Sequence, residues 1–104
     1  MIRIRFDERD GRLRLAMEGH AGYAPAGQDT VCAAASMLGQ TLALAVREQP
    51  GSRSRKASGR LEIVCDPTPE AQAMFRMARA GFEALAAAYG AWVRVEEAAG
   101  APGG

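Results

Sequence analysis

The spacing of apolar residues changes once in the first third of this chain, from a period of two to a helical period. Residues 2–6 alternate between apolar and charged side chains, which predicts a half-buried strand. Asp10-Gly11 is a strong hairpin signal, and 12–18 alternate in the same way. The chain is therefore expected to open with an antiparallel hairpin that is apolar on one face.

A first helix is expected from Asp29 until just before Pro50. Asp29 is a good N-cap, because its carboxylate can accept backbone N–H groups of the first turn. The helical period lasts for about four turns after it. Positions 49–60 are polar and basic, which indicates a loop, and 61–65 return to the alternation of a strand.

A second helix is predicted to begin after Thr68-Pro69, a capping residue followed by a proline at the first helical position. Residues 92–96 form a last short strand. The order ββαβαβ predicts an α/β (α+β) two-layer sandwich, in which two helices cover one face of a four-stranded sheet. We expect a single domain at 1–97 and a flexible C-terminal tail at 98–104.

Composition excludes several classes of protein. The formal net charge of +1 gives no overall field that would attract nucleic acid or a membrane. No apolar run is long enough to span a membrane, and the alternating start does not resemble a signal peptide, so a cytoplasmic location is expected. Two cysteines and one histidine form neither a disulfide framework nor a four-ligand zinc site. We therefore expect no metal.

One segment combines a thiol with an imidazole. His20, the only histidine, follows the second strand, and Cys32 lies in the first turn of the expected helix. The positive end of a helix favours a thiolate, its unpaired amides could bind an oxyanion, and a nearby imidazole could take the thiol proton. Asp29 opposes thiolate formation unless its charge is used elsewhere, in capping the helix or in orienting His20.

Spacing alone favours a structural interpretation of these two residues. A cysteine at a helix start is usually a small hydrophobic residue, and a lone histidine after a strand is usually a loop donor or a packed ring. Cys65 shares the apolar face of its strand and is expected in the core.

The order of residues in the segment is more specific than its spacing. It resembles the ribosomal-processing cysteine protease family, Prp, at Gly19-His20-Ala21, Gly27, Asp29, Val31-Cys32-Ala33-Ala34 and Ser36. The resemblance implies a site-specific cysteine endopeptidase. In Firmicutes and related bacteria, proteins of this family remove the N-terminal extension of large-subunit ribosomal protein twenty-seven. They act as homodimers without a cofactor.

The same resemblance assigns roles to residues. Cys32 would be the nucleophile and His20 the general base. The supporting positions would be Asp29 and Ser36, with Gly19 and Gly27 at the ends of a mobile loop.

Residues 22–27 offer few side chains that could pack, so we expect them to be mobile and to close over a bound peptide. The free enzyme would then lack a hydrogen bond between His20 and Cys32. Tentative substrate-binding residues beside the thiol are Tyr23, Met37 and Gln40.

A basic stretch supplies the alternative function. Dense charge is found only at Arg53, Arg55, Lys56 and Arg60, with Arg47 nearby, which is typical of a solvated loop. They could instead contact an acidic partner or ribosomal RNA; direct RNA contact is possible but not expected, and the lack of interleaved aromatic residues argues against base stacking. The alternative is a non-catalytic ribosome- or RNA-associated binding module in which Cys32 and His20 are structural. A Cys32→Ser change would abolish cleavage in an enzyme and would be silent in such a module.

Overall fold

The computed structural model describes residues 1–25 and 27–97 of the 104-residue chain. Ala26, which belongs to the loop expected to be mobile, and the tail expected at 98–104 lie outside the described residues. The elements follow in the order β1 (Ile2–Arg9), β2 (Arg12–Glu18), α1 (Thr30–Ala45), β3 (Arg53–Ala57), β4 (Arg60–Cys65), α2 (Pro69–Ala88) and β5 (Val93–Glu97).

The described part contains a five-stranded sheet, so the expected four strands and the order ββαβαβ were wrong in detail. The missed strand is β3, which lies inside the segment 49–60 that was expected to be a loop. All five of its side chains are exposed, and it pairs only with β4 at the edge of the sheet. Because neither face of this strand is covered, its sequence carries no apolar alternation that could reveal it.

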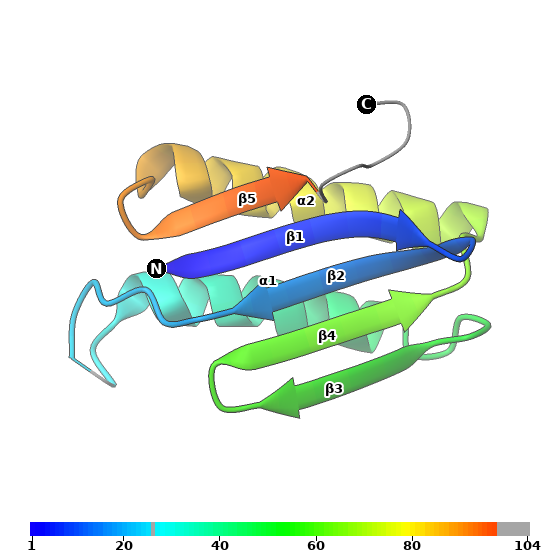
Figure 1. Cartoon of the computed structure of the whole chain (residues 1–104), viewed down its shortest axis with the longest axis horizontal. Helices are drawn as coiled ribbons and strands as arrows, with labels where there is room; N and C mark the ends of the chain where they lie inside the picture. Colours follow the sequence, from blue (N-terminus) through cyan, green and yellow to red (C-terminus); the bar gives the residue numbers. More distant parts are fainter. Residues whose placement is uncertain (26, 98–104) are drawn as a thin grey trace.

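The strand order is β3-β4-β2-β1-β5 (Figure 1). Neighbouring strands pair antiparallel, except for β1 and β5, which pair parallel. These directions make β4 and β5 parallel to each other, with β2 and β1 between them. Helix α2 therefore connects two parallel strands that are not neighbours, and the sheet is mixed.

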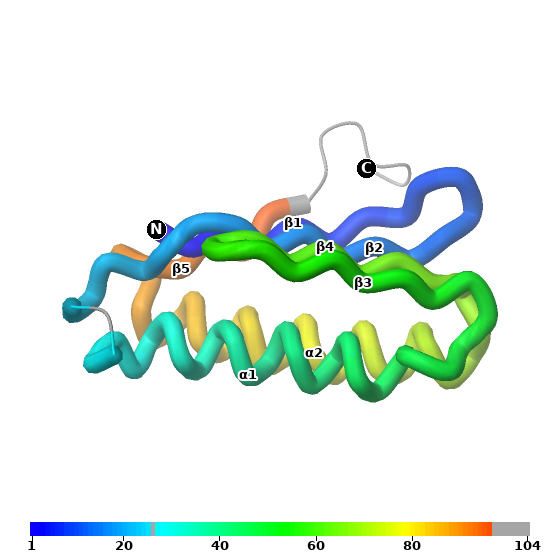
Figure 2. The backbone as a smooth tube through the Cα atoms, turned by 90° about the horizontal axis from the view of Figure 1, so that it is seen from below, coloured from blue at the N-terminus to red at the C-terminus, as the bar shows by residue number. Residues whose placement is uncertain are grey.

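Both helices lie side by side along the same side of the sheet (Figure 2). The sheet residues that face them are almost fully buried, with Ile4, Leu15 and Ile63 each 0% exposed. The Phe6 ring packs edge-on against Phe82 of α2, with 6.1 Å between the ring centroids. These contacts form the core, and they leave the other side of the sheet to solvent. Neither helix is long and apolar enough to cross a membrane in the part of the chain described.

Both predicted N-caps are confirmed. The Asp29 carboxylate accepts a hydrogen bond from the Cys32 amide at 2.8 Å, and the Thr68 hydroxyl accepts one from the Ala71 amide at 3.0 Å. Each cap satisfies an amide that has no partner within its own helix. The Asp29 cap also fixes the thiol-bearing turn at the start of α1.

Candidate active site

An open cleft of about 460 Å³ lies where the loop after β2 meets the first turns of α1. It brings together the predicted pair, His20 and Cys32, and the two supporting polar residues, Asp29 and Ser36. Four small residues complete the lining: Gly22, Ala24, Gly27 and Ala33. A small-residue lining leaves room for a peptide backbone to approach the thiol.

Asp29 holds the loop against the helix. One carboxylate oxygen accepts the Cys32 amide, while the other accepts the amides of Tyr23 at 3.0 Å and Ala24 at 3.4 Å. These backbone donors, the Cys32 amide above all, hold the pKa of Asp29 below its usual value. No hydrogen bond joins Asp29 to His20 within the described residues. Of the two roles that the sequence left open, the structure therefore favours capping, and it adds the role of a loop clamp.

His20 lies on a backbone that is fixed by a distant turn. The amide of Gly19 donates to the carbonyl of Gly59, in the turn between β3 and β4, at 2.8 Å. A Cβ atom on Gly59 would lie only 2.8 Å from Nε2 of His20, so the imidazole rests directly against this glycine. Gly19 itself has a φ of +97°, and a Cβ there would collide with the carbonyl of Met1. The contribution of Gly59 was missed, because the sequence shows only an ordinary Ser-Gly turn far from the motif.

Cys32 is half-buried in the first turn of α1. Its amide is bound to Asp29, and the Ala33 amide donates to the Asp29 carbonyl at 3.0 Å. The expectation that first-turn amides are unpaired was therefore wrong for these two groups. Ser36 is one turn further along, and its hydroxyl oxygen accepts a hydrogen bond from Gln40 Nε2 at 2.8 Å. The Ser36 hydroxyl keeps its own proton to donate.

The described residues contain no hydrogen bond between His20 and Cys32. The two side chains thus border one cleft without a direct polar link. That arrangement agrees with the hypothesis of a loop that closes on substrate, and the closing movement itself stays a prediction.

None of the three tentative substrate-binding residues, Tyr23, Met37 and Gln40, lines the cleft. The Tyr23 ring packs edge-on against Trp92, with 4.9 Å between centroids, and also against Tyr89. This contact anchors the loop to the connection between α2 and β5. Tyr23 does not line the cleft, and neither does Met37, whose side chain is 67% exposed. Gln40 is also absent from the lining, and it is connected to the cleft by its hydrogen bond to Ser36.

Both cysteines are free thiols with different surroundings. Cys65 is fully buried, as expected. Burial is the larger cause that raises the pKa of its thiol, and the negative charge of Asp66 raises it further. In the part of the chain that the structure describes, no group of three or more His, Cys, Asp or Glu side chains could hold a metal ion.

An α+β fold that places a half-buried thiol at a helix start, in one cleft with an imidazole, has the features of a cysteine hydrolase. The sequence model of the family described as cysteine protease Prp matches residues 1–94, and the chain belongs to this family. The resemblance seen in the segment around His20 and Cys32 is thereby confirmed. No curated protein matches the sequence.

Solved structures share the fold. The ribosomal processing protease Prp of Staphylococcus aureus with a covalently linked product peptide has a TM-score of 0.80 at 24% identity, covering 94% of this chain and 100% of that one. The same protease with a substrate peptide has a TM-score of 0.76 at 22% identity and the same coverage. The SMU.848 protein of Streptococcus mutans has a TM-score of 0.69 at 26% identity, covering 93% of each chain.

Proposed function

We propose that this chain is a site-specific cysteine endopeptidase that removes the N-terminal extension of large-subunit ribosomal protein twenty-seven. The observation that carries the proposal is the shared cleft, which is lined by both His20 and Cys32 and is open to solvent. Membership of a cysteine protease family supports the reaction class. The description of the Staphylococcus aureus relative as a ribosomal processing protease, solved with peptides, supports the substrate class.

In the proposed mechanism His20 acts twice. Its imidazole first takes the proton from the Cys32 thiol, and the thiolate sulfur then attacks the carbonyl carbon of the scissile bond. The C–N bond breaks as the imidazolium returns the proton to the leaving amine. A water molecule, deprotonated by His20, then attacks the thioester carbonyl; the C–S bond breaks, the acid product leaves, and the imidazolium returns the proton to the Cys32 sulfur. Each step moves one proton through the same imidazole.

Asp29 and Ser36 support the reaction without transferring protons themselves. Asp29 directs its charge into backbone amides, so that it fixes the cleft without binding His20. The Ser36 hydroxyl, whose oxygen is occupied by Gln40, is a donor for the substrate or for Cys32. Because the Cys32 and Ala33 amides are already engaged, the oxyanion needs donors other than these two. The family resemblance adds that the enzyme works as a homodimer, and the alternating N-terminal sequence supports a cytoplasmic location.

The test compares cleavage of two synthetic peptides, the extended N-terminus of the ribosomal protein and its trimmed form. Wild-type protein should cleave only the extended peptide, and Cys32→Ser should abolish the cleavage while thermal unfolding stays the same. Cys65→Ala is the matched control, because it removes the other thiol but leaves the cleft intact. Cleavage that survives in Cys32→Ser, or that is lost equally in Cys65→Ala, would refute the assignment.

A further inference from the structure

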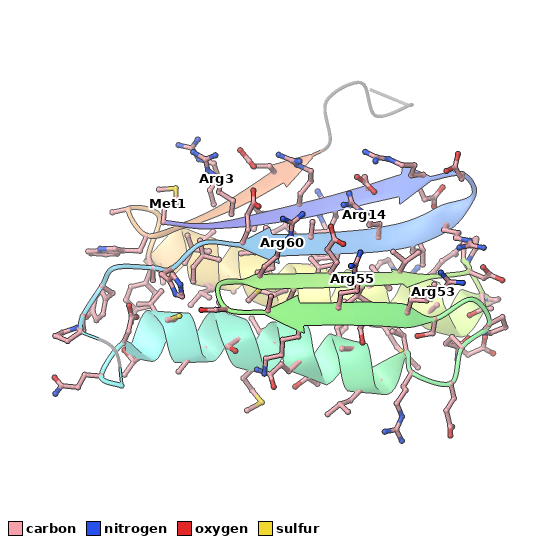
Figure 3. All side chains as sticks on the ribbon, turned by 60° about the horizontal axis from the view of Figure 1, so that its bottom comes forward. Met1, Arg3, Arg14, Arg53, Arg55 and Arg60 are labelled. Atoms are coloured by element: carbon pink, nitrogen blue, oxygen red, sulfur yellow. The ribbon has the colours of Figure 1, made fainter. Side chains whose placement is uncertain are left out.

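The side of the sheet that faces away from the helices gathers most of the positive charge of the protein. Strand pairing places alternate residues of all five strands on this side. They include nine arginines, Arg3, Arg5, Arg9, Arg12, Arg14, Arg53, Arg55, Arg60 and Arg94, and four carboxylates, Asp7, Glu18, Glu62 and Glu96. Figure 3 shows several of these side chains projecting from the sheet. This arginine face carries an excess of five positive charges in a chain whose formal net charge is +1.

Carboxylates neutralise the middle of the arginine face. Arg14 reaches Asp7 at 3.2 Å and Glu62 at 3.0 Å, and Arg60 reaches Glu62 at 3.4 Å. Although burial raises the pKa of Glu62, hydrogen bonds from Arg14 and Arg60 outweigh it and hold that pKa below its usual value. Ion pairs of this kind fix guanidinium groups in place.

The edges of the arginine face hold unpaired cations. Among the described side chains, no carboxylate lies within ion-pair distance of four arginines: Arg3 and Arg94 near one edge, and Arg53 and Arg55 on β3 at the other. The edge strands β3 and β5 are four strand spacings apart, which is about 19 Å. Shallow hollows of about 360, 160 and 430 Å³ lie on the face, each lined by at least two arginines. The surface therefore presents two separated groups of free cations.

The composition of the arginine face selects its partner. No aromatic side chain lies on it, so it has no platform on which the bases of a single strand could stack. A second copy of the chain fits poorly, because two faces of equal positive excess repel and neither offers the apolar centre of a homodimer interface. The phosphates of a rigid double helix are negative along both of its strands, so they match the sign of the free arginines at the two edges of the face.

We propose that the arginine face binds the phosphate backbone of an RNA double helix. Contacts to backbone phosphates carry no sequence information, so recognition through them would be independent of sequence. The choice of RNA over DNA rests on the proposed function, which brings the protein to a ribosomal protein. The cleft is lined by the loop after β2 and the first turns of α1, and α1 lies along the opposite side of the sheet from the arginine face (Figure 2). RNA and a peptide could therefore be bound together.

The experiment measures binding of the full chain to a fluorescent RNA duplex of about 16 base pairs, by anisotropy at a series of salt concentrations. If the four unpaired arginines contact phosphates, the slope of log K against log salt is about −3 to −4. Arg53→Gln with Arg55→Gln should weaken binding about tenfold at low salt and reduce the slope by about two. The control pair is Arg47→Gln with Arg76→Gln, which removes two exposed arginines outside this face and should change nothing.

Four results would overturn the proposal. The first two are binding that is absent and binding that is insensitive to salt. The third is a control pair that weakens binding as much as the β3 pair does. The fourth is a β3 pair that converts a dimer into a monomer in sedimentation, which would make the face an interface between copies. Peptide cleavage is measured on the same variants: the β3 pair should cleave at the wild-type rate, so failure of RNA binding and failure of the protease assignment are seen separately.

Discussion

Gly59→Ala is the most direct test of how the fold positions His20. Gly59 lies in the turn between β3 and β4 with a φ of +67°, and its added Cβ would be 2.8 Å from Nε2 of His20 and 3.4 Å from two ring carbons. Unstrained contacts between such atoms need about 3.5–4.0 Å, so the imidazole must move by roughly 1 Å. The nearest atoms belong to the end of a side chain, which can move without unfolding the sheet.

The size of the effect follows from this displacement. A misplacement of about 1 Å in a reacting group costs on the order of 10²-fold in rate. We therefore expect kcat/KM for the extended peptide to fall about a hundredfold, chiefly through kcat, because the role proposed for His20 is proton transfer and not substrate affinity. The positive φ adds a stability cost of about 1–2 kcal/mol for alanine.

Gly11→Ala is the matched control. Gly11 also lies in a tight hairpin turn, between β1 and β2, with a φ of +72°, but a Cβ there meets no atom within 4 Å. It should therefore carry a similar stability cost and leave cleavage unchanged. Thermal unfolding measures the first effect, and initial rates below saturation measure the second.

The chain offers a readout that does not depend on activity. Because His20 is the only histidine, its ring gives a single Hε1 signal in the proton NMR spectrum. Gly59→Ala should shift this signal and Gly11→Ala should not. If the signal stays in place in Gly59→Ala, or if both variants cleave within about threefold of each other, the turn does not position His20.

Three further predictions concern the helix start, the thiols and the core. Asp29→Asn should make the melting temperature depend less on pH in acid. The folded-state pKa of Asp29 lies below 3.8, so its ionised carboxylate stabilises the fold fully above that pH and loses this effect as pH falls through the lowered pKa. Melting curves recorded across this pH range measure the difference between the two proteins. A thiol reagent should titrate only Cys32 in the native protein and also Cys65 in denaturant, because Cys65 is 0% exposed and its pKa is raised; a fast second thiol in the native protein would contradict this. Phe82→Ala should cost about 3–5 kcal/mol in urea unfolding, since the ring is 0% exposed, whereas Met77→Ala at 80% exposure should cost less than about 0.5 kcal/mol.

Local patterns in the sequence were enough for most of the scaffold. The alternation of 2–6 and 12–18 predicted β1 and β2, and Asp29 and Thr68 were recognised as helix caps because capping is decided within four residues. The candidate catalytic segment was recognised from the order of residues between Gly19 and Ser36, which resembles that of the Prp family. Each of these features depends on neighbours along the chain, which a sequence displays directly.

Tertiary structure decided what depends on contacts between distant residues. Strand β3 forms because it pairs with the edge of β4, and its sequence has no alternating apolar residues from which a strand could be predicted. The support of His20 by Gly59 requires that same hairpin to fold back against the loop. The arginine face arises because strand register aligns side chains from five separate segments, while the sequence reports only a net charge of +1. A charge balance along the chain is a sum, and it contains no information about which side of the sheet each charge will occupy.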